Sequence, residues 1–145
     1  MIRKKIVTGI MCAALALSSV SAFAATYENS QSFSGVVLPE SSGNTTLASV
    51  AKKTTSRSYG RAKITSYTNC SKVSCWYRTT LSDGSVHYWL PYMVTISDKS
   101  YHKVNYVDKD AAYYKKGVKA EMRAENATEA LNLKTEKVSG TIDFN

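Results

Sequence analysis

Cys70 and Cys75 are the residues whose spacing points to one chemistry most directly. They lie in the stretch NCSKVSC (69–75), with four residues between them. A redox pair has two intervening residues, and a structural zinc site needs four ligands, which no second cysteine pair or spaced histidine pair completes. In an exported protein the pattern predicts a Cys70–Cys75 disulfide. This bridge would contribute about 2 kcal/mol, because the loop that it closes is short. Two reduced thiols are the alternative.

His87 and His102 are the only histidines of the chain. Strand pairing could bring them together, and Asp98 or Asp108 could complete a metal site or a proton relay. Two histidines in a Tyr-rich β protein are more often surface residues, so we expect no metal ligand among them.

Three carboxylates, Glu121, Glu125 and Asp143, could supply the acid pair of a glycosidase. The two glutamates alternate with Lys119 and Arg123, which is typical of ion-paired charges on the solvated face of a strand. The chain also lacks the nucleophile elbow, the zinc-protease helix motif, the phosphate-binding loop and the EF-hand spacing. We therefore expect a protein that is not an enzyme and that needs no cofactor.

The N-terminus predicts export. A basic start at residues 3–5 precedes an apolar run at 6–20, and Ala22-Phe23-Ala24 offers small residues for cleavage before Ala25. We interpret residues 1–24 as a bacterial signal peptide, so the protein is expected to be secreted and not an integral membrane protein. Its removal takes away three of 19 basic residues and none of 11 acidic ones, which leaves a net charge of +5. That charge favours anionic extracellular partners, and secretion argues against nucleic acid.

The remaining pattern predicts strands. Residues 25–31 are expected to form a flexible tail and 32–38 a first strand, followed by two strands in 46–68 that are separated at Gly60. A strand is expected at 75–81 and another at 99–107. Between them a single long strand is predicted, because the even positions from Val86 to Ile96 are all apolar or aromatic. Pro91 makes it an edge strand or a bulged one.

The C-terminal third contains a conflict of signals. The composition of 119–136 favours helix, whereas apolar and charged residues alternate strictly over 118–125, and we predict a strand there. Residues 127–134 are expected to form a helical turn, and 138–144 a last strand. Seven to nine short strands predict one all-β domain at 32–145, an antiparallel β-sandwich. A barrel is the alternative.

Two groups of side chains are candidates for surface binding. The odd positions of the long strand carry His87, Trp89 and Met93, which either pack under a second layer or form an exposed platform. The connection at 108–117 carries the others, Tyr113, Tyr114, Lys115 and Lys116, a combination suited to anionic surfaces. A solvated basic loop is the alternative for this second group.

The layout resembles a loosely defined set of small secreted Firmicutes proteins of unknown function, some described as bacteriocin-like. The resemblance is carried by the signal peptide, the Thr/Ser/Tyr-rich middle, Arg123-Ala124-Glu125-Asn126 and Ser139-Gly140. It implies an extracellular role and transfers no catalytic residue.

The sequence thus predicts a non-catalytic interaction module at a bacterial cell envelope. Its partner would be an anionic cell-wall polymer, a glycan, a membrane surface or a protein. The alternative is a bacteriocin-like antimicrobial or toxin protein, and an extracellular hydrolase ranks below both.

Overall fold

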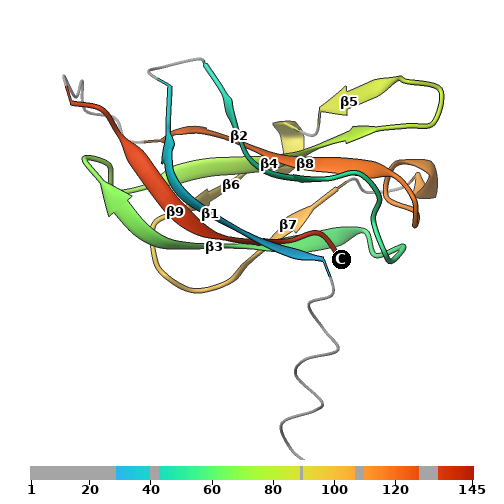
Figure 1. The fold of residues 1–145 in the computed structure, drawn as a ribbon, viewed down its shortest axis with the longest axis horizontal. Coiled ribbons are helices and arrows are strands. Elements are labelled where there is room, and N and C mark those ends of the chain that lie inside the picture. The colour runs from blue at the N-terminus through green and yellow to red at the C-terminus, as the bar shows by residue number, and fades with distance from the viewer. Residues whose placement is uncertain (1–28, 40–42, 89, 107–109, 128–133) are drawn as a thin grey trace, which may run out of the picture.

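The protein is an antiparallel β-sandwich in the computed structural model, which describes residues 29–39, 43–88, 90–106, 110–127 and 134–145. Two sheets pack face to face, with strand orders β1-β9-β3-β7 and β2-β8-β4-β5, and β6 also pairs with β4 (Figure 1). The predicted sandwich is confirmed. The strands are β1 (Ser30–Val37), β2 (Thr45–Val50), β3 (Tyr59–Thr68), β4 (Val73–Thr80), β5 (Val86–Tyr88), β6 (Val94–Ile96), β7 (His102–Asn105), β8 (Lys119–Asn126) and β9 (Lys137–Asp143).

Alternating apolar residues fill the space between the sheets. In β8, Ala120, Met122 and Ala124 are buried, whereas Lys119 is exposed. The strand prediction for 118–125 is therefore confirmed over the helical composition, because burial of one face outweighs weak intrinsic propensity. In β9, Val138 and Ile142 are buried in the same way.

Gly60 does not separate two strands, as the sequence had suggested, but lies inside β3. The break is at residues 51–58, between β2 and β3. A Cβ atom at Gly60 would lie 2.0 Å from the Tyr77 hydroxyl oxygen and 2.2 Å from the Asp143 carbonyl oxygen. The glycine is thus needed for close packing rather than for a turn. The first strand also begins earlier than expected, since Ser30 already pairs with Asp143.

The predicted long strand is divided into β5, a 3-10 turn η1 (Leu90–Tyr92) and β6. Both strands pair with the edge of β4, β5 at residues 78–80 and β6 at residues 73–75. Pro91 lies in the turn, where its missing N–H costs no ladder bond. The edge position is confirmed, but the buried even face holds only for the second half. Val86 and Tyr88 are 39% and 50% exposed, whereas Val94 packs partly against the core and Ile96 is fully buried.

The predicted disulfide is also corrected, because Cys70 and Cys75 are free thiols. Cys75 is buried in the core between the sheets, and burial raises its pKa to about 12. Cys70 lies in the β3–β4 turn, and its thiol donates to the Lys137 carbonyl oxygen at 3.6 Å. Cys75 is thus a member of the core, whereas Cys70 packs partly against the core and contacts strand β9.

Residues 1–28 and 128–133 lie outside the described residues, and with them the expected signal peptide and most of the expected helical turn. No helix of the described part is long and apolar enough to cross a membrane.

Candidate functional site

The outer face of β3 and β7 gathers cations and tyrosines. In β3, Gly60, Ala62 and Ile64 point into the core, so the residues between them face outward. Strand β7 pairs with the first four residues of β3 (Figure 1). We call this surface the basic face; it comprises Arg57, Tyr59, Arg61 and Lys63 from the β3 side and Tyr101 and Lys103 from the β7 side.

Like charges stand side by side on this face. Arg61 is the direct cross-strand partner of Lys103, a pairing that is normally unfavourable. The tyrosine rings offset part of this repulsion. The Lys103 ammonium lies 4.5 Å from the centre of the Tyr59 ring, and the Arg61 guanidinium and Lys63 ammonium each lie 5.4 Å from the centre of the Tyr101 ring.

Asp143 of β9 is the acidic side chain paired with this face. Its Oδ2 lies 3.1 Å from the Arg61 guanidinium, and its side chain is almost fully covered. Among the residues that the structure describes, the four cations of the basic face are paired with one carboxylate, that of Asp143, and this surface carries a net positive charge.

A small pocket of about 160 Å³ opens at one end of the basic face. Arginines from the β2–β3 connection and from β3 stand on one side, and the C-terminal end of β9 and the residues after it stand on the other. The lining residues are Arg57, Tyr59, Gly60, Arg61, Asp143 and Asn145.

Three buried side chains hold the backbone beneath this pocket. The Tyr77 hydroxyl donates to the Asp143 carbonyl oxygen at 2.7 Å, and the Tyr106 hydroxyl donates to the Phe144 carbonyl oxygen at 3.0 Å. The Lys53 ammonium also donates to the Phe144 carbonyl oxygen, at 2.8 Å. The two tyrosine rings are stacked, with centres 3.9 Å apart. These three hydrogen bonds hold the Asp143 and Phe144 carbonyl groups at the C-terminal side of the pocket.

Lys53 is an unusual member of this floor, because it is a lysine that is only 1% exposed. Its ammonium lies 3.7 Å from the centre of the Tyr106 ring. Burial lowers the pKa of Lys53 from 10.5 to about 7, and the nearby Asp143 carboxylate offsets part of that effect.

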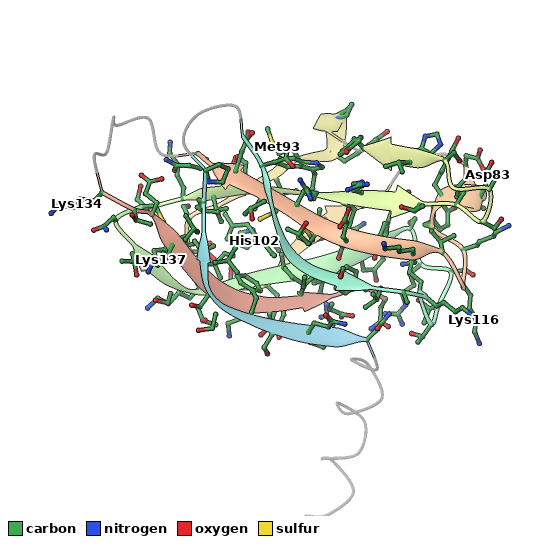
Figure 2. All side chains as sticks on the ribbon, turned by 45° about the horizontal axis from the view of Figure 1, so that its top comes forward. Asp83, Met93, His102, Lys116, Lys134 and Lys137 are labelled. Atoms are coloured by element: carbon green, nitrogen blue, oxygen red, sulfur yellow. The ribbon has the colours of Figure 1, made fainter. Side chains whose placement is uncertain are left out.

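The surface candidates from the sequence do not form one patch. His87 and Tyr113 do meet, with ring centres 4.2 Å apart. Tyr114 packs partly against the core, while Lys115 and Lys116 are exposed. Met93 is 42% exposed but lies well away from Lys116 in Figure 2, and Trp89 lies outside the described residues.

The groups considered for chemistry are likewise separate. His102 pairs with Asp98 at 2.9 Å in the turn before β7, and hydrogen bonds from Ser100 and His102 hold the pKa of Asp98 well below its usual range. Glu121 is bound to Arg78 at 2.5 Å on the β2-β8-β4-β5 sheet, whereas Asp143 belongs to the other sheet. Glu121 and Asp143 therefore form no carboxylate pair. Within the described ranges, no cluster of three or more His, Cys, Asp or Glu side chains could hold a metal ion.

The basic face was not among the sites predicted from the sequence, although the residues carry a signal for it. Small or apolar residues alternate with Arg57, Tyr59, Arg61 and Lys63. A cation or tyrosine likewise stands at every second position at Lys99, Tyr101 and Lys103. Such alternation of cations and aromatics marks one outward face of a strand.

Comparisons of the chain with protein-family models, with curated proteins and with solved structures found no match.

Proposed function

We propose that the protein is a secreted, non-catalytic module that binds an anionic polymer of the bacterial cell envelope through its basic face. The observation that carries the proposal is the cross-strand pairing of Arg61 with Lys103. Like charges placed directly opposite each other destabilise a sheet. The Asp143 carboxylate already pairs with Arg61, and a bound polyanion would neutralise the positive charge that remains.

The shape of the face supports an extended ligand. Alternate residues on a strand lie about 7 Å apart, so the stretch from Tyr59 to Lys63 offers roughly 13 Å of track along β3. Strand β7 adds Lys103 beside it. A linear polymer that carries repeated negative groups can meet several of these cations at once, whereas a small ion can meet one or two.

A binding assay with matched variants tests the proposal. The double variant Lys63→Gln, Lys103→Gln removes two cations of the basic face, and Lys115→Gln, Lys116→Gln removes two from the exposed loop. Retention is measured on immobilised poly(glycerol phosphate), with uncharged dextran as the reference. A cation near an anionic surface contributes about 1 kcal/mol, so the first variant is expected to bind roughly thirtyfold more weakly.

The second variant should change retention much less, and binding by the unaltered protein should weaken markedly by about 0.5 M salt, because salt screens exposed charges. Equal losses of retention in the two variants would mean that the polymer responds to net charge alone and not to the basic face. A larger loss in the loop variant would transfer the site to Lys115 and Lys116. No retention even at low salt would refute the proposal.

A further inference from the structure

We propose that the pocket at the end of the basic face is an anchor site for one singly charged oxyanion group, a phosphodiester or a carboxylate. The inference rests on the proposed function for its biological setting, but it concerns a different set of residues. It adds a specific point of attachment to a face that otherwise attracts negative charge along its length.

The size of the pocket limits what it can hold. A volume of 160 Å³ corresponds to about five water molecules, and it is roughly half of the smallest pockets that enclose a drug-sized ligand. It therefore suits one functional group of a longer ligand rather than a whole metabolite.

The donors in the pocket are suited to an oxyanion. The exposed Arg57 side chain makes no hydrogen bond or ion pair with another described residue. Arg61 lines the same pocket, where its guanidinium is paired with Asp143 at 3.1 Å. Planar guanidinium groups bind carboxylate and phosphate oxygens in pairs, which a lysine cannot do.

The charges of the lining side chains favour a ligand group that carries one negative charge. Arg57 and Arg61 bring two positive charges and Asp143 brings one negative charge. One further negative charge balances these three side chains. The Asp143 carboxylate would repel a doubly charged group, so a phosphodiester or a carboxylate fits better than a phosphate monoester.

The two walls of the pocket are joined underneath by Lys53. Its ammonium donates to the Phe144 carbonyl oxygen at 2.8 Å and to the Arg57 carbonyl oxygen at 3.4 Å. The segment that carries Arg57 is thereby tied to the C-terminal segment that carries Asp143. Because this tie exists before any ligand binds, little ordering of the backbone opposes binding.

The test is a titration of the full chain, labelled with nitrogen-15, with dimethyl phosphate and separately with acetate, followed by NMR. Saturable shifts are expected at the Gly60 and Asn145 amides. Arg57→Gln should weaken the affinity tenfold or more. The control Lys134→Gln removes the same charge at the end of the molecule opposite Lys116, as Figure 2 shows, and should leave the affinity unchanged. The anion that binds more tightly identifies the chemistry of the natural group.

The outcomes for this site and for the polymer are separable. If neither anion gives saturable shifts at the pocket, or if Arg57→Gln and Lys134→Gln act alike, the anchor site is refuted. Polymer retention that still depends on Lys63 and Lys103 would then leave the proposed function standing. Conversely, saturable anion binding without polymer retention would support the anchor site and refute the proposed binding of an anionic polymer.

Discussion

Lys53 offers a quantitative test of the buried floor beneath the pocket. The folded protein lowers its pKa from 10.5 to about 7, mainly because burial disfavours the charged ammonium. One pKa unit corresponds to 1.36 kcal/mol, so a charged Lys53 costs the folded state about 5 kcal/mol relative to the unfolded chain. Replacement by methionine removes this cost and also removes the hydrogen bond to the Phe144 carbonyl oxygen.

The sign of the pH dependence follows from the direction of the shift. At pH 6 Lys53 is protonated in both states, and the folded state bears the full cost. As the pH rises through 7, the folded state releases the proton while the unfolded state keeps it. Stability rises with pH wherever the unfolded state binds more protons. At pH 8.5 about 2 kcal/mol of the cost has disappeared.

The assay compares wild type and Lys53→Met by urea unfolding at pH 6 and pH 8.5. Their difference in unfolding free energy should shift by about 2 kcal/mol between the two conditions, in favour of the wild type at the higher pH. Other titrating groups cancel, because both proteins contain them. The neighbouring Lys52 is exposed, so Lys52→Met serves as the control for removing a lysine at this point of the chain. A difference that stays constant for Lys53→Met would refute the lowered pKa of the buried lysine.

Two further predictions concern packing. Gly60→Ala should lower the unfolding free energy by about 3 kcal/mol or more, because the new methyl group would overlap the Tyr77 hydroxyl. The control Gly84→Ala should cost about 1 kcal/mol, because its Cβ atom would meet nothing within 4 Å. Thermal unfolding measures both losses, and similar losses would contradict the contact between Gly60 and Tyr77. In the native protein a thiol reagent should not label Cys75 and should label Cys70 slowly at most. Both cysteines should react after unfolding. An intact mass two hydrogens below that of the reduced chain would show instead that a disulfide forms.

The sandwich and its C-terminal strands were predictable because their patterns are strictly periodic. In 118–125 the alternation of apolar and charged residues corresponds to burial of Ala120, Met122 and Ala124. The same rule failed at 86–96, where an equally regular pattern lies on an edge. An edge strand has no sheet neighbour on one side, so Pro91 could interrupt it and leave Val86 and Tyr88 in solvent.

The pocket could not be predicted, because it depends on contacts distant in the sequence. Lys53 reaches Phe144 across 91 residues, and Tyr77 reaches Asp143 across 66. No local pattern shows that a lysine in a Ser/Thr-rich connection is buried. The prediction of a Cys70–Cys75 disulfide failed for a related reason. The spacing of the two cysteines permits a disulfide, but it does not show which neighbouring residues each side chain contacts.

Strand β3 joins the core to the candidate site. Gly60, which points inward, has no side chain, and Tyr77 and the C-terminal segment can therefore approach it closely. The odd residues of β3 are held outward as a row of charges with the pocket at one end. A substitution at Gly60 should therefore weaken anion binding without removing any charge, because it displaces the wall formed by Asp143. For Arg57→Gln we expect the opposite combination, intact stability with weakened anion binding. The contrast between these two variants distinguishes the architecture of the pocket from its chemistry.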